Sequence, residues 1–166
     1  AGVMGLICPM VNTAQDAARL VSYCRYPPAG QRSFGPIRAL FSEGADYPER
    51  ANDEVVVLAM IETAEGVANM EAIAATPGLD GLYIGPSDLT IGVTNGALKP
   101  GMDRQEPEMI ELIQRIRATA HAAGKKACLH CASPAYAVQA IGWGFDLVTL
   151  TNDVRLLAKA AEDNIA

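Results

Sequence analysis

The stretch VVVLAMIETAEGVANMEAIAATPGLDGLYIGPSDL, residues 55–89, decides the fold class of this chain. An apolar run at residues 55–61 has the length and the β-branched content of a buried strand. The helix expected at residues 64–75 stops at Thr76-Pro77-Gly78, and a second apolar run, GLYIG, follows at residues 81–85. A strand, a helix and a second strand in this order form a β/α/β unit, which predicts a parallel sheet.

The rest of the chain repeats this alternation of strand and helix. Five β/α units can be counted, and the other strands are expected at GLICPMV, KACLHC and FDLVTL, residues 5–11, 126–131 and 145–150. Two long stretches, residues 29–53 and 86–106, lie between predicted elements, and we expect them to be loops.

Several helix ends carry recognisable signals. Thr13 can cap the first helix, and Asp16, three residues on, can complete a capping box. Pro107 suits the first turn of another helix, and Gly124 suits its C-terminal stop. Ser133 precedes Pro134 at the expected start of the next helix. These signals place the boundaries of the β/α units.

Periodicity alone leaves two arrangements of five parallel strands open. They can form an open, doubly wound sheet, or they can be part of a closed (β/α)8 TIM barrel. Neither G-x-G-x-x-G nor G-x-x-x-x-G-K-[ST] occurs in the sequence. The chain therefore lacks the commonest nucleotide-binding motifs of such sheets.

The composition is that of a single aliphatic domain, because half the residues are apolar and only 5% are aromatic. The net charge is −6 and no Lys or Arg residues cluster, which argues against a nucleic-acid partner. No run approaches the ~18 apolar residues of a membrane span, and no signal peptide is recognisable, so we expect a cytoplasmic protein without membrane contact. The four cysteines lie in apolar or alternating runs and are expected to be reduced.

Two carboxylates are placed where parallel α/β folds build their sites. Glu62 directly follows the strand at residues 55–61, and Asp88 lies three residues past GLYIG. If the two strands are neighbours, the carboxylates can converge, and two like charges so close require a cation or a proton between them. Carboxylates without Cys or His favour a hard ion such as Mg²⁺ or Mn²⁺. The alternative is that Glu62 or Asp88 caps the following helix.

The motifs R-Y-P-P-x-G-x-R, I-E-T and G-P-S-D-L occur in this order, at residues 25–32, 61–63 and 85–89. Each motif alone is weak, but their combination is specific. The segments that contain them resemble the two signature stretches of the HpcH/HpaI aldolases, which are pyruvate-specific class II enzymes. The resemblance extends from about Gly5 to the last helix.

The resemblance implies a metal bound by Glu62 and Asp88, and a pyruvate carboxylate held beside Gly85, Pro86 and Ser87. Pro86 has no N–H, so Ser87 and the turn itself are the better donors. It also implies cleavage of 4-hydroxy-2-oxo acids to pyruvate and an aldehyde through a metal-stabilised enolate, with Mg²⁺ or Mn²⁺ as the cofactor. Members of the family commonly assemble as hexamers, so we expect a homo-oligomer.

Aligned with this family, residues 1–166 correspond to strands 4–8 of the barrel with their helices, the C-terminal part of a single TIM-barrel domain. The first three β/α units, which carry the family's catalytic His and a keto-acid-binding Arg, are absent from the sequence, so no catalytic residue can be assigned. We expect this polypeptide alone to be catalytically incompetent, because a partial barrel exposes its edges and its aliphatic core.

Three positions carry further hypotheses. Met60 stands where many relatives have Gln, which removes a polar group near the keto acid. His130 ends a strand and can contact the aldehyde portion of the substrate or replace a lost base, or it can simply bond the backbone. Arg32 can contact the substrate or order its loop through an ion pair.

Two rival functions remain open at this point. One is another lyase or decarboxylase of keto acids from the same barrel superfamily. The other is a non-catalytic fragment that acts only in assembly.

Overall fold

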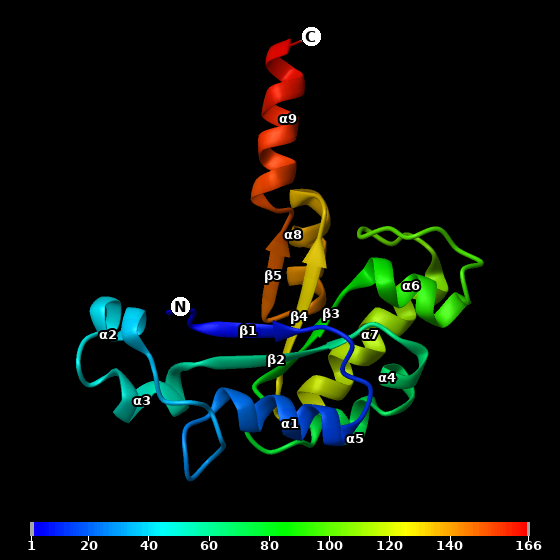
Figure 1. Ribbon diagram of the computed structural model, residues 1–166. Helices are drawn as coiled ribbons and strands as arrows, with labels where there is room; N and C mark the ends of the chain where they lie inside the picture. Colours follow the sequence, from blue (N-terminus) through cyan, green and yellow to red (C-terminus); the bar gives the residue numbers. More distant parts are fainter. Residues whose placement is uncertain (1, 166) are drawn as a thin grey trace.

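Five parallel strands form one curled sheet in the computed structural model, which describes residues 2–165 (Figure 1). They lie in the order β1-β2-β3-β4-β5, so each strand pairs with its neighbours in the sequence. A doubly wound sheet requires a reversal of strand order, and none occurs here. The sheet is therefore a half-barrel. The strands are β1 (Gly5–Cys8), β2 (Val56–Ile61), β3 (Gly81–Ile84), β4 (Lys126–Cys131) and β5 (Leu147–Leu150).

Most helices of the β/α units pack on the convex face of this half-barrel. Parallel neighbours are joined by right-handed crossovers, which place successive helices on the same side of a sheet. The helices are α1 (Ala14–Cys24), α2 (Ile37–Glu43), α3 (Tyr47–Glu54), α4 (Ala64–Ala68), α5 (Met70–Ala74), α6 (Pro86–Thr94), α7 (Pro107–Ala122), α8 (Pro134–Trp143) and α9 (Asp153–Ile165).

The pleat of the strands divides their side chains between two faces. In β2, Val57, Ala59 and Ile61 belong to the main hydrophobic core beneath the helices. Leu58 lies on the opposite, concave face, in a smaller cluster with Tyr83, Cys128 and Met60. Successive strand residues point to opposite faces, so the concave face is built from every second residue of each strand.

The structure confirms the helix signals read from the sequence. Thr13 and Asp16 form a capping box at the start of α1. Ser133 caps α8 through a hydrogen bond from the Tyr136 N–H. The helix that follows Pro107 ends at Ala122, just before Gly124. All four cysteines are free thiols.

The two stretches expected as loops contain three helices, α2, α3 and α6, so these loop predictions were wrong. Pro48 and Pro86 lie in the first turns of α3 and α6, and Gly44 ends α2. In these stretches Pro and Gly mark the starts and stops of short helices, as they do at helix ends in general. The helix predicted at residues 64–75 is also interrupted, at Asn69, whose side chain donates to the Asn12 carbonyl (2.8 Å).

Acidic and basic side chains tie the strands together at the N-terminal rim of the sheet. Asp80 accepts hydrogen bonds from the Val57 N–H (2.7 Å) and from Arg25 (3.1 Å). The buried Arg25 also donates to the carbonyl of Val55 (2.5 Å). Asp146 accepts from the Ala127 N–H (2.9 Å) in the same way. This rim is held by satisfied ion pairs and hydrogen bonds.

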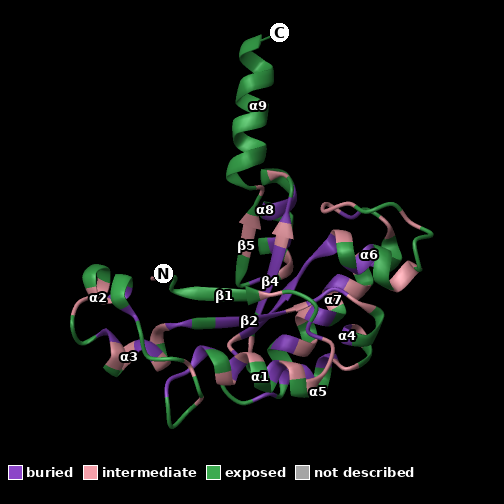
Figure 2. Cartoon of the chain, in the orientation of Figure 1, coloured by how far each residue is buried: buried purple, intermediate pink, exposed green. Residues whose placement is uncertain are grey.

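The last helix, α9, projects away from the rest of the molecule (Figure 1) and is exposed along its length (Figure 2). Its apolar residues Val154 and Leu157 are 70% and 72% exposed. Within residues 2–165, no helix has the length and apolar character needed to cross a membrane.

Candidate functional site

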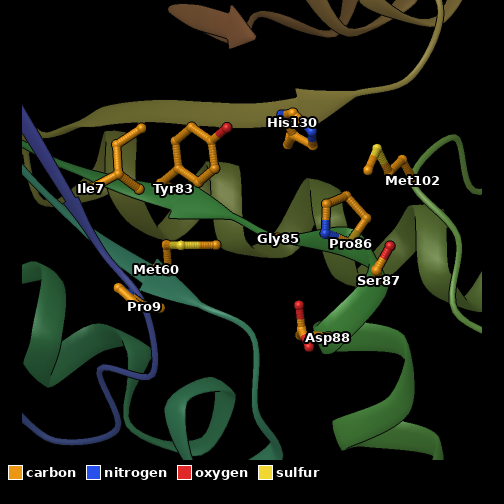
Figure 3. Close-up of a pocket in the computed structure, with 10 residues that line it drawn as sticks. All are labelled: Ile7, Pro9, Met60, Tyr83, Gly85, Pro86, Ser87, Asp88, Met102 and His130. Carbon is orange, nitrogen blue, oxygen red and sulfur yellow. The ribbon is translucent and has the colours of Figure 1, made fainter. Parts of the chain in front are cut away.

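A pocket of about 410 Å³ opens on the concave face, at the C-terminal ends of the strands (Figure 3). This is the end of a parallel α/β sheet at which ligands bind. The pocket contains five of the residues predicted from the sequence, Gly85, Pro86, Ser87, Asp88 and His130. The other residues that line it are mostly apolar: Ile7, Pro9, Met60, Tyr83 and Met102.

Glu62 directly follows β2, is only 3% exposed and is not one of the residues that line the pocket. Its Oε1 accepts a hydrogen bond from the Met10 N–H (2.8 Å). Met10 has a left-handed backbone conformation (φ 57°), which is uncommon for a residue with a side chain and occurs most often at functional sites. The loop after β1 thus adopts an unusual conformation that helps to fix one oxygen of Glu62.

The second oxygen of Glu62 points toward Gly85. A Cβ atom at Gly85 would lie 2.6 Å from Glu62 Oε2 and 2.7 Å from Met60 Cε. A larger residue at this position would displace the ends of both side chains, so glycine lets this carboxylate approach the end of β3. Glycine is needed here for space, because its φ of −98° is open to any residue.

Asp88 lies in the first turn of α6, on the same rim as Glu62. Its negative charge contributes to raising the pKa of Glu62, after the larger contribution from the burial of Glu62 itself. The hydrogen bond from Met10 opposes both effects. Neither carboxylate forms an ion pair with a Lys, Arg or His side chain among residues 2–165. The two predicted acids therefore lie at the same end of the sheet, and within the described residues no protein cation balances either of them.

The alternative that Glu62 caps a helix does not agree with the structure. The N-cap of α4 is Thr63, whose hydroxyl accepts from the Gly66 N–H (2.9 Å). Asp88 does occupy the first turn of α6, where a negative charge is favourable. That position does not prevent Asp88 from binding a cation.

The pair of carboxylates fits a hard divalent cation as a partial ligand set. The described part of the chain contains no group of three or more His, Cys, Asp or Glu residues that could hold a metal. Two carboxylates leave several coordination positions for water and substrate oxygens, as is usual for Mg²⁺. The raised pKa of Glu62 adds to this fit, because a cation beside it would offset the cost of its buried charge.

The segment of Gly85, Pro86 and Ser87 presents the N-terminus of α6 to the pocket. Gly85 is the N-cap and Pro86 is the first helical residue. The first N–H groups of a helix have no partner within the helix, and they attract anions. Since Pro86 has no N–H, the amides of Ser87 and Asp88 are the available donors.

His130 lies in the pocket, on the inner side of β4 (Figure 3). His130 does not bond the backbone, which was one alternative from the sequence. Its Nδ1 is instead hydrogen-bonded to the Thr149 hydroxyl (2.8 Å). Burial lowers the pKa of His130, the charge of Arg155 lowers it further, and Asp103 opposes the shift. The imidazole is therefore neutral at pH 7.

Arg32 does not reach the pocket. Its guanidinium lies 4.4 Å from the ring centroid of Tyr26 and donates to the Tyr47 hydroxyl (3.1 Å). It also forms no ion pair within residues 2–165, so the loop is ordered by aromatic contacts rather than by the ion pair we predicted.

Sequence reasoning missed three contributors to the site. The amide of Met10 gave no signal, because any residue could supply it. Tyr83 was assigned only to a strand, although its position beside a strand end in an alternating pattern predicts an inward side chain. Thr149 was likewise assigned only to a strand, and its hydrogen-bond partners depend on the register between β4 and β5.

Comparisons with known proteins identify the family of the chain. The family model for HpcH/HpaI aldolase/citrate lyase matches residues 1–160. A hydroxypyruvate/pyruvate aldolase of Rhizorhabdus wittichii is 42% identical over 166 residues, which is 100% of this chain and 65% of the relative. A 2-keto-3-deoxy-L-rhamnonate aldolase of Klebsiella pneumoniae is 35% identical over 170 residues, or 99% of this chain and 61% of the relative.

A solved structure shares the fold. An HpcH/HpaI aldolase/citrate lyase family protein from Burkholderia cenocepacia superimposes with a TM-score of 0.82 at 31% identity, over 99% of this chain and 64% of that one. The chain thus spans a little under two thirds of the length of these relatives. The match over residues 1–160 covers nearly the whole chain and includes Glu62, Asp88 and residues 85–87. The chain therefore belongs to the HpcH/HpaI aldolase/citrate lyase family.

Proposed function

We propose that the protein is a divalent-metal-dependent aldolase that cleaves 4-hydroxy-2-oxo acids to pyruvate and an aldehyde. The observation that carries this proposal is the pair Glu62 and Asp88, which follow the C-terminal ends of the neighbouring strands β2 and β3 and form no ion pair with a cationic side chain among residues 2–165. The names of the relatives support the same chemistry, because they are pyruvate or 2-keto-3-deoxy-acid aldolases.

The residues of this chain supply the position of the cation and of the keto acid. Glu62 is held by the Met10 N–H and by its approach to Gly85, so its carboxylate needs little reorganisation to bind an ion. Asp88 adds a second oxygen ligand from α6. The N–H groups of Ser87 and Asp88 would donate hydrogen bonds to the carboxylate of a 2-oxo acid at the helix N-terminus. A bound Mg²⁺ or Mn²⁺ supplies Lewis acidity that stabilises the negative charge of a pyruvate enolate.

The apolar lining of the pocket suits the aldehyde portion. Ile7, Met60 and Met102 surround the space beyond the helix N-terminus. Apolar walls exclude water and strengthen the electrostatic interactions at the carboxylates. Met60 offers no hydrogen bond, so the keto acid is held by the rim of β3 and α6 alone on this side.

We further infer that β1 to β5 correspond to strands 4–8 of an eight-stranded barrel. The sequential strand order and the curled sheet support this assignment. The proposal includes a homo-oligomeric, cytoplasmic enzyme whose partners are small 2-oxo acids and aldehydes.

Exchange of the pyruvate methyl protons with solvent tests the proposal, because it reports enolate formation without an aldehyde. The full-length protein is incubated with pyruvate in deuterium oxide, with Mn²⁺ or with a chelator. We expect exchange only with metal, and a loss of at least ~100-fold in Glu62→Ala. The matched control is Glu71→Ala, which removes an exposed acid from α5 and leaves the rate unchanged.

Two outcomes contradict the proposal. Metal-independent exchange would show that the carboxylates do not act through a cation. Absence of exchange in the metal-loaded, folded protein would exclude a pyruvate aldolase, and a different keto-acid lyase would then be the better hypothesis.

A further inference from the structure

A polar chain of three side chains crosses the concave face of the sheet. The Tyr83 hydroxyl is hydrogen-bonded to the Thr149 hydroxyl, which in turn is bonded to His130 Nδ1 (2.8 Å). The three residues come from β3, β5 and β4, and His130 and Thr149 are direct partners in the register of β4 with β5. Polar groups are otherwise scarce on this face, which carries Leu58, Met60 and Cys128 beside Tyr83.

The positions of the protons in this polar chain of three side chains can be assigned by counting hydrogen-bond donors. Tyr83 is 5% exposed, and burial raises the pKa of its phenol, so it keeps its proton at neutral pH. Thr149 is its only hydrogen-bond partner in the described part of the chain. If Tyr83 donates to Thr149, the Thr149 hydroxyl can donate to Nδ1 of His130, and both hydroxyl protons are used. If Nδ1–H donated to the same oxygen instead, the Thr149 O–H would have no acceptor among residues 2–165. The opposite direction leaves the buried Tyr83 O–H without an acceptor, which is unfavourable.

This direction determines the tautomer of His130. When Nδ1 accepts a hydrogen bond in a neutral imidazole, the ring proton resides on Nε2. No protein atom among residues 2–165 bonds to Nε2, whereas the ring lies in the pocket near Pro86 and Met102 (Figure 3). His130 therefore presents a neutral N–H donor to a largely apolar wall.

The nearby acid does not compete for this ring. The carboxylate of Asp103 accepts hydrogen bonds from the Ala132 N–H (2.7 Å) and the Ser133 hydroxyl (2.6 Å). It holds the loop before α8 in place and is not a hydrogen-bond partner of His130. The orientation of the ring thus depends on Thr149.

We propose that the polar chain fixes His130 as an Nε2–H donor that binds an oxygen atom of the aldehyde portion of the substrate. This inference rests on the proposed function, because it assumes that the metal and the keto acid occupy the rim near Glu62. His130 is on β4, two strands away from β2, which is roughly 10 Å at ~4.8 Å per strand. That separation is too long for His130 to be a ligand of a cation at Glu62, and the ring instead faces the pocket space beside Pro86 and Met102, where the portion of the substrate beyond the cation would lie.

Two substitutions at one position test the donor. In His130→Gln the amide nitrogen can replace Nε2, whereas in His130→Asn it can reach only the position of Nδ1. The full-length, Mn²⁺-loaded protein is assayed for addition of pyruvate to glycolaldehyde, with kcat and KM measured separately. Pyruvate proton exchange is measured in parallel, because it requires no aldehyde.

We expect kcat/KM for glycolaldehyde to fall by about 10- to 100-fold in His130→Asn and by less than about 5-fold in His130→Gln. Proton exchange should stay within about 2-fold of the unsubstituted protein in both variants. Equal losses in the two variants, or a parallel loss of proton exchange, would overturn the proposal. If the proposed function itself is wrong, the unsubstituted protein will show no metal-dependent exchange. The two failures can therefore be distinguished.

The tautomer can also be observed directly. Nitrogen-15 NMR of histidine-labelled protein distinguishes Nε2–H from Nδ1–H, and the signal of His130 is the one that disappears in His130→Gln. We expect Nε2–H in the unsubstituted protein and a mixture of tautomers in Thr149→Val. Thr149→Ser keeps the hydroxyl and should keep the single tautomer. An Nδ1–H form in the unsubstituted protein would overturn the assignment.

Discussion

The two rims of the sheet use the same acidic residue types for opposite purposes. At the N-terminal rim, Asp80 and Asp146 each accept a strand N–H and pair with a cationic side chain. At the C-terminal rim, Glu62 accepts one N–H, and neither Glu62 nor Asp88 has a cationic partner among residues 2–165. An acid that is fully paired stabilises the fold, whereas an acid left unbalanced marks a place for a ligand.

The pKa shifts follow this difference. The Ala127 N–H, with His121 and Lys126, lowers the pKa of Asp146 far below its ordinary value. Burial and the charge of Asp88 raise the pKa of Glu62. Ionisation is therefore favoured by the fold at one rim and opposed by it at the other, and only the second rim has an electrostatic reason to bind a cation.

The largest effect should come from removing a charge at the C-terminal rim. Asp88→Asn keeps the shape of the side chain but removes one ligand, so we expect metal-dependent proton exchange to fall by at least ~100-fold while the protein stays folded. Steady-state exchange rates and a thermal unfolding curve measure the two quantities. A variant with full activity would break the comparison between the rims.

A steric change should weaken the site without altering its charge. In Gly85→Ala the new methyl group would collide with Oε2 of Glu62. We expect the carboxylate to shift and the affinity for Mn²⁺ to fall by about 10- to 100-fold, measured by calorimetric titration. Gly142→Ala is the control, since nothing lies within 4 Å of a Cβ at that position in α8. Equal affinities in the two variants would contradict the role of Gly85.

At the N-terminal rim, Asp146→Asn should affect stability and leave activity unchanged. Because half-exposed ion pairs are screened by solvent, we expect a loss of about 1 kcal/mol at pH 7 in urea unfolding. The folded pKa of Asp146 is lowered, so its contribution is complete above the ordinary value of 3.8 and is lost as the pH falls below it. The difference between variant and parent should therefore shrink at pH 3. A constant difference would point to a cause other than charge.

The smallest effect should have the opposite sign. Without metal, Glu62→Gln should raise the free energy of unfolding at pH 7, because it removes an ionised group that the fold disfavours. The raised pKa of Glu62 means that the parent loses stability as the pH rises above 4.5, so the advantage of the variant should vanish below that pH. Saturating Mn²⁺ should reverse the order by stabilising only the parent. A destabilised variant in the presence of a chelator would contradict this account.

Sequence reasoning succeeded where a signal is local. The strand at residues 126–131, the Thr13 capping box and the position of Glu62 at a strand end all follow from a few adjacent residues. It failed for α2, α3 and α6, because short helices bounded by Pro and Gly resemble loops in composition.

Features that depend on packing between strands could not be predicted at all. The order of the strands is not encoded in periodicity, so the half-barrel had to come from the structure or from the resemblance. The pairing of Thr149 with Tyr83 and His130 requires the register of three strands at once. The stacking of Arg32 on Tyr26 likewise depends on how a loop folds back on itself.

The pleat of the strands has an evolutionary consequence. Along β2, moving one residue from Ala59 to Met60 crosses from the helix-packed core to the wall of the pocket. Tyr83 is the partner of Met60 on β3, and His130 also faces inward, two residues beyond the partner of Tyr83 on β4. Selection for a new aldehyde can therefore act on these alternate residues while the outward set is conserved for folding, so that specificity can diverge among descendants without loss of the scaffold.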